Sequence, residues 1–137
     1  MKQINIWALL AASVLSYAVN FVWFMFIFSE PYLQGLGKTD EELALGPNGI
    51  EASIMQLVGN VVMAFVLSWL AVRMGMQTAL QGAKLGAIAW VGFVAAVLGP
   101  MYAFQAFSLA FFLITAGSVL LTFVITGAIV GGWQAKK

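Results

Sequence analysis

Among its 137 residues the sequence has no cysteine and no histidine. Without cysteine there are no disulfide bonds, thiolate metal sites or cysteine nucleophiles. Without histidine the chain lacks a main zinc and haem ligand and the base of the Ser–His catalytic pair. Six basic and five acidic residues nearly balance, so no basic patch exists to neutralise nucleic-acid phosphates. We therefore expect no cofactor, no metal, no nucleic-acid partner and no enzymatic activity.

Charged residues are also scarce. Only 8% of the residues are charged and 63% are hydrophobic, with a mean hydropathy of +0.99. A soluble domain carries about a quarter charged residues. This composition indicates an integral membrane protein whose first partner is the lipid bilayer. A secretory signal peptide is the competing interpretation of the N-terminus, but the first apolar run exceeds the roughly 7–15 apolar residues of such signals.

The chain contains four long apolar runs. Residues 4–28 carry no charge, and a helix of this length covers roughly 37 Å, more than the roughly 30 Å hydrocarbon core of a bilayer. Three further runs follow at about residues 52–72, 85–102 and 107–130. We expect an all-α integral membrane protein, in which a bundle of four transmembrane helices forms a single membrane domain over residues 1–137.

The only sizeable polar stretch lies between the first two runs, at residues 29–51. Thr39 followed by Glu42 matches a capping box, which predicts a short surface helix in this loop. Pro31 and Tyr32 come directly after the first span. We expect them to form a turn at the membrane interface, with the tyrosine at headgroup depth.

The basic residues predict the orientation in the membrane. In a four-span protein, five of the six basic residues lie on one side of the membrane, namely Lys2, Arg73, Lys84, Lys136 and Lys137. The other side receives Lys38 and all five acidic residues, which are Glu30, Asp40, Glu41, Glu42 and Glu51. By the positive-inside rule both termini are expected in the cytoplasm, with the chain in the cytoplasmic (inner) membrane and the polar loop outside.

Polar residues in three of the four runs share one helical face each. They recur at intervals of three and four residues: Ser13, Ser16, Tyr17 and Asn20; Ser53, Gln56 and Asn60; Thr115, Ser118, Thr122 and Thr126. We expect these faces to meet as a polar seam, with Asn20 near the depth of Asn60 and Tyr17 facing Thr115 and Ser118.

The seam has two interpretations. Uncharged polar side chains in membrane helices commonly hold helices together by hydrogen bonds. Alternatively, Tyr17, Asn20, Gln56, Asn60 and Thr115 line a polar cavity that opens to the outside. Ionisable groups are absent from the span centres, which leaves Glu51, at the outer edge of the second span, as the one candidate for a functional carboxylate.

Small residues and one proline mark the later spans. Gly82 with Gly86, and Gly127 with Gly131, form two GxxxG motifs. Such motifs allow close helix packing, which we expect within one chain, a dimer face being the alternative. Pro100 is expected to end the third helix, the alternative being a break that opens a binding site.

Several short motifs resemble those of a bacterial membrane family known as domain of unknown function 1761. They are the Ile-Asn pair at residues 4–5, Trp-Phe at 23–24, Phe-Ser-Glu-Pro-Tyr at 28–32, Thr-Asp-Glu-Glu-Leu at 39–43 and Gly-Gly-Trp at 131–133. The resemblance covers essentially the whole chain and implies the four-span layout. It implies no activity. The chain departs from the family at Phe24, where a tyrosine is usual, at Glu30, where a basic residue is usual, and at Thr115, where an asparagine is usual and a nearby histidine is missing.

Three functional hypotheses follow, of which a membrane enzyme is the weakest because the sequence lacks catalytic groups. The first is a non-enzymatic membrane protein that acts by association, as an accessory subunit of a larger complex or as a homo-oligomer. The alternative is a small-molecule transporter or binding protein that uses a polar cavity open to the extracytoplasmic side.

Overall fold

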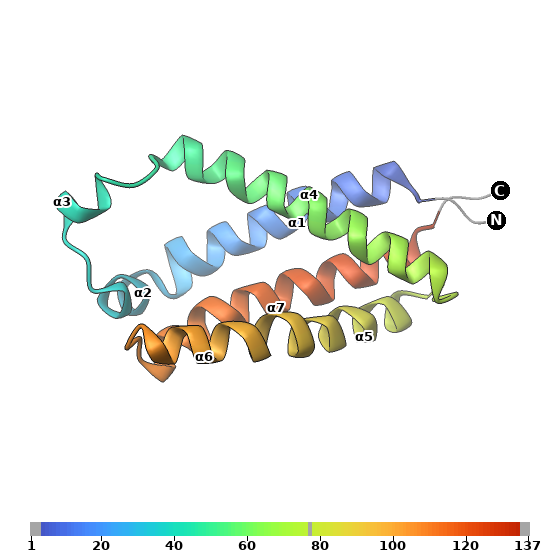
Figure 1. Ribbon diagram of the computed structural model, residues 1–137. Helices are drawn as coiled ribbons and strands as arrows, with labels where there is room; N and C mark the ends of the chain where they lie inside the picture. Colours follow the sequence, from blue (N-terminus) through green and yellow to red (C-terminus); the bar gives the residue numbers. More distant parts are fainter. Residues whose placement is uncertain (1–3, 77, 135–137) are drawn as a thin grey trace.

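The computed structural model describes residues 4–76 and 78–134. Four helices are long and apolar enough to cross a membrane, namely Ile6–Ile27, Gly49–Arg73, Ala79–Phe104 and Leu109–Gly132. They lie as an antiparallel bundle (Figure 1). The predicted all-α architecture with four spans is confirmed. The third span begins at Ala79, six residues before its expected start at 85, because Thr78 caps it by accepting the Gln81 amide hydrogen at 3.1 Å.

Two of the spans contain a segment of π-helix. The first span consists of α1 (Ile6–Val22) and the π segment η1 (Trp23–Ile27). The third consists of α5 (Ala79–Trp90), the π segment η2 (Val91–Ala95) and α6 (Ala96–Phe104). The second and fourth spans, α4 (Gly49–Arg73) and α7 (Leu109–Gly132), are single α-helices.

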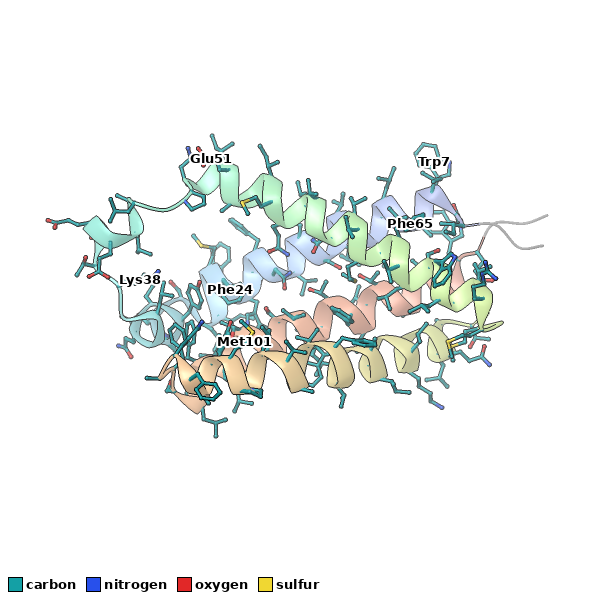
Figure 2. The ribbon with its side chains drawn as sticks, in the orientation of Figure 1. Trp7, Phe24, Lys38, Glu51, Phe65 and Met101 are labelled. Atoms are coloured by element: carbon teal, nitrogen blue, oxygen red, sulfur yellow. The ribbon has the colours of Figure 1, made fainter. Side chains whose placement is uncertain are left out.

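The bundle has two distinct ends, which we name by what lies there. At the termini end are the first and last described residues and the turn between α4 and α5 (Figure 1). At the loop end are the connection between the first two spans and the tight turn between α6 and α7 (Figure 1). Trp7 lies at the termini end, opposite Lys38 and Glu51 (Figure 2).

Glycine allows α5 and α7 to pack backbone against backbone. A methyl group at Gly82 would fall on the carbonyl group of Gly127, and one at Gly86 would fall on that of Phe123. A methyl group at Gly131 would lie 2.7 Å from the carbonyl oxygen of Thr78. The two GxxxG motifs therefore pack against each other within one chain, as expected.

Helix α7 is the centre of the bundle, because it packs against α1, α4 and α5. Near the termini end a hydrophobic core joins α4, α5 and α7, and its buried members are Leu67, Ala71, Leu85, Ala89 and Val130. In α4 the buried residues begin at Asn60. The α4 ribbon diverges from the bundle toward the loop end (Figure 1), where residues 50–59 are not buried.

The connection at the loop end holds two short helices, α2 (Ser29–Leu36) and α3 (Asp40–Leu43). The predicted short helix is α3, and the hydroxyl of Thr39 accepts the Glu42 amide hydrogen at 3.1 Å. The expected turn at Pro31 and Tyr32 is wrong, because both residues lie inside α2. A proline fits the first turn of a helix, where its missing N–H has no partner to lose.

Pro100 does not end the third span, contrary to expectation, since α6 continues to Phe104. In a regular α-helix the proline ring would clash with the carbonyl of Ala96, four residues earlier. The π segment η2 ends at Ala95, directly before that residue. The span nevertheless continues through the proline for four more residues, to Phe104.

We predict that Gly82→Ala lowers the free energy of unfolding by about 1–3 kcal/mol, because the added methyl group forces α5 and α7 apart. The matched control is Gly59→Ala, where a methyl group meets no atom within 4 Å. Removing this helical glycine should leave stability unchanged or raise it by up to about 1 kcal/mol. Thermal unfolding in mild detergent measures both variants. Equal effects of the two changes would contradict the packing described.

The orientation can be tested by cysteine labelling, because the chain has no cysteine of its own. Leu43 in α3 and Met74 after α4 are both exposed and lie at opposite ends of the bundle. We predict that an impermeant thiol reagent added to intact cells labels Leu43→Cys and spares Met74→Cys. Labelling of Met74→Cys alone would reverse the orientation.

Candidate functional site

The polar residues of α1 and α7 pair inside the bundle. The hydroxyls of Ser16 and Thr126 lie 3.1 Å apart, and both residues are fully buried. One turn toward the loop end, Asn20 donates its amide N–H to the Thr122 hydroxyl at 3.0 Å. These contacts satisfy polar groups in a region without water, so they hold α1 and α7 together.

A second set of hydrogen bonds joins α1 to α4. Asn60 donates to the backbone carbonyl of Ser13 at 3.2 Å and accepts from the side-chain amide of Gln56 at 3.0 Å. Toward the loop end, the Tyr17 hydroxyl donates to the Ser53 hydroxyl at 2.9 Å. Asn60 is buried, whereas Gln56 is exposed, so this set of contacts runs from the core to the open part of α4.

Thr115 and Ser118 do not face Tyr17. Thr115 donates its hydroxyl to the carbonyls of Phe111 and Phe112 in its own helix, at 3.0 and 3.2 Å. The Ser118 hydroxyl likewise donates to the carbonyl of Thr115 at 2.8 Å. The structure therefore brings Tyr17, Asn20, Gln56 and Asn60 together along α1 and α4, while the hydroxyls of Thr115 and Ser118 bond within α7.

Two tryptophans donate hydrogen bonds to the backbone of α7. Trp23, the first residue of η1, donates its indole N–H to the carbonyl of Ile114 at 2.9 Å. Trp90, directly before η2, donates to the carbonyl of Ala116 at 3.0 Å. Each π segment therefore begins at or directly after a tryptophan, and the two tryptophans bond to nearly the same depth of α7.

An open pocket of about 350 Å³ lies between α1, η1, α2 and α4 at the loop end. Its lining residues are Tyr17, Asn20, Phe21, Phe24, Met25, Tyr32, Ala52, Ser53 and Gln56. Four predicted seam residues, Tyr17, Asn20, Ser53 and Gln56, are among them. The pocket lies beside the part of α4 that leaves the bundle. The same side chains therefore hold α1 and α4 together and line the pocket.

Helix α2 closes the pocket at the loop end. Tyr32 packs edge-on against Phe24 with ring centroids 4.9 Å apart, and it stacks on Phe111 at 5.6 Å. Gly35 permits this approach, because a methyl group there would lie 2.6 Å from the Phe111 ring. Burial in this cluster, together with the neighbouring Tyr102, raises the pKa of Tyr32, so its hydroxyl stays neutral.

Glu51 has a role at the start of α4. Its backbone N–H is accepted by the side-chain oxygen of Asn48 at 2.8 Å, and its carboxylate accepts from the Asn48 amide at 3.0 Å. This reciprocal pair caps the helix. Glu51 is exposed and is not among the pocket-lining residues. Within residues 4–76 and 78–134, no group of three or more acidic side chains is close enough to hold a metal ion.

The aromatic wall of the pocket was not predicted from the sequence. Phe21, Phe24 and Met25 continue the helical face of Tyr17 at intervals of three and four residues, which is the signal that identifies them. Tyr32 could not be found in this way, because its position depends on the return of α2 over the end of the bundle.

We predict that Asn60→Leu lowers the free energy of unfolding by roughly 1–2 kcal/mol, because it removes hydrogen bonds to both Gln56 and Ser13. Gln34→Leu on the exposed surface of α2 is the matched control and should leave the stability unchanged. Chemical unfolding in detergent measures the difference. An unchanged stability of Asn60→Leu would mean that these bonds contribute nothing to the fold.

Comparison with known proteins supports the architecture. The model of a protein family described as "Protein of unknown function (DUF1761)" matches residues 7–131. No curated protein and no solved structure matches the chain significantly. The matched range covers all four spans except their outermost residues, Ile6 and Gly132, and it includes every residue that lines the pocket. The chain therefore belongs to the DUF1761 family of multi-span membrane proteins.

Proposed function

We propose that this protein works by binding a small molecule in the pocket between α1 and α4, without catalysing a reaction on it. The observation that carries the proposal is the pocket of about 350 Å³, in which polar and aromatic side chains of the first two membrane spans meet beside Tyr32 of α2. Small-molecule sites are typically concave and mostly apolar, with volumes of about 300–1,000 Å³ and a few polar groups that orient the ligand.

The way in which the polar residues are used supports this proposal. Asn20 and Asn60 are buried and bonded to α7 and α1, which is what structural hydrogen bonds require. Gln56 is exposed although it lies within a membrane span. Exposing an amide to hydrocarbon is costly. The Gln56 amide donates one hydrogen to Asn60, and a ligand, or water that accompanies it, can bond to its other polar groups at the pocket.

The other functional hypothesis, association with a partner protein or a second copy, has lost part of its support. It rested on the lack of catalytic groups and on small-residue and aromatic faces that could pack against another chain. Gly82, Gly86, Gly127 and Gly131 are instead engaged between α5 and α7 of the same chain. Binding in the pocket is therefore the function that we favour.

The proposal is tested by filling the pocket. Ala52 lines it, and Val58, six residues further along the same helix, is exposed and does not. Native mass spectrometry of protein extracted in mild detergent should show wild type with one bound small molecule per chain. We predict that Ala52→Phe loses this molecule and that Val58→Phe retains it.

Two outcomes would contradict the proposal. One is wild-type protein that carries no small molecule when extracted gently and when exposed to membrane extract. The other is equal retention in Ala52→Phe and Val58→Phe, which would place the molecule elsewhere on the protein. The unfolding temperature of each variant is measured in parallel, so that loss of the fold is recognised separately.

A further inference from the structure

We infer that the ligand of this pocket is an uncharged amphiphile that enters from the bilayer and places a hydroxyl or carbonyl group against Tyr17, Ser53 and Gln56. The inference rests on the proposed function and specifies the class of molecule. It is drawn from three features of the pocket, which are its lack of charge, the arrangement of its polar groups and its position within the spans.

No residue that lines the pocket is an aspartate, glutamate, lysine or arginine. A charged group that leaves water requires an opposite charge or a full set of hydrogen bonds, and its burial is otherwise unfavourable by several kcal/mol. A tyrosine hydroxyl is already neutral near pH 7, and burial raises the pKa of Tyr32 further. The pocket therefore selects against ions.

Polar groups of α1 and α4 meet in the pocket. The hydroxyls of Tyr17 and Ser53 are 2.9 Å apart, and Gln56 follows Ser53 by one turn of α4. Together they present hydroxyl and amide groups that both donate and accept. A single hydroxyl or carbonyl group of a ligand can bond to this set, whereas a larger polar molecule would leave its other groups facing aromatic rings.

Most of the other lining residues are apolar, and the pocket opens laterally toward the bilayer. Phe21 and Met25 line the pocket and are also 47% and 58% exposed. Both lie within the first membrane span, so their exposed faces meet lipid. Across the pocket, residues 50–59 of α4 are not buried. An apolar chain that lies between α1 and α4 would therefore remain in contact with the bilayer while its polar end is bound.

The test uses three photoreactive alkyl probes of equal chain length, which end in a hydroxyl, a carboxylate or a trimethylammonium group. They are added to the full-length protein in lipid nanodiscs, and the labelled peptides are identified by mass spectrometry. We expect the alcohol probe to label peptides from α1, η1 and α4 at least about tenfold more than either charged probe, since charge is excluded there. An excess of unlabelled alcohol should abolish this labelling.

Variants assign the contact. We expect Gln56→Leu to lower pocket labelling by the alcohol probe at least about threefold, since a hydrogen bond to the head group is lost. Gln34→Leu on the exposed surface of α2 is the control and should label as wild type does. Tyr17→Phe, which removes only the hydroxyl group, is the second variant if Gln56→Leu does not fold.

The outcomes separate this inference from the proposed function. Equal labelling of the pocket by charged and uncharged probes, competed by each and lost in Ala52→Phe, would overturn the ligand class and keep the pocket as a binding site. Labelling that is spread evenly over all lipid-facing helices, and is unchanged in Ala52→Phe, would overturn both.

Discussion

The close contact between α5 and α7 is the constraint on which the rest of the bundle depends. Gly82 and Gly86 meet the backbone of α7 directly, so the distance between these helices and their rotation are both fixed. Once the rotation of α7 is fixed, Thr122 and Thr126 point to α1 and receive Asn20 and Ser16. The polar contacts of the bundle are therefore a consequence of the glycine contact.

The contacts that hold α1 to α7 and α4 to α1 also shape the pocket. Helix α1 is held against α7, and α4 is in turn held against α1 through Asn60 and Ser13. Toward the loop end, α4 has no buried residue before Asn60, and the bond from Tyr17 to Ser53 links this part of it to α1. The space that opens between the two helices is closed at its end by Tyr32 of α2. A tightly packed half thus supports an open half, which is the arrangement that a binding site needs.

The sequence predicted those features that composition and helical period determine. Four apolar runs predicted four spans, the Thr39–Glu42 spacing predicted α3, and the GxxxG motifs predicted a close contact within the chain. Side-chain periodicity did not predict the π segments, because it assumes a regular helix throughout. At the depth of Thr115, α1 has already become η1 and presents Trp23 to the Ile114 carbonyl, so Tyr17 cannot reach that part of α7.

Long-range contacts explain the remaining differences. Tyr32 follows a proline and was expected in a turn, but the ring of Phe111 and the small residue Gly35 draw α2 over the end of the bundle. No local pattern encodes such a return, since it depends on a partner far along the chain. The pocket combines residues from both kinds of region. Tyr17, Asn20 and Gln56 could be predicted from the helical period, and Tyr32 could not.

The central claim is that the space between α1 and α4 holds a molecule other than protein. The most direct measurement is nuclear Overhauser contacts from the side-chain amide of Gln56 and the ring of Tyr17 in protein extracted into deuterated detergent. We predict contacts from both side chains to the protons of one co-purified molecule. Contacts to water alone, with α4 closed onto α1, would contradict it.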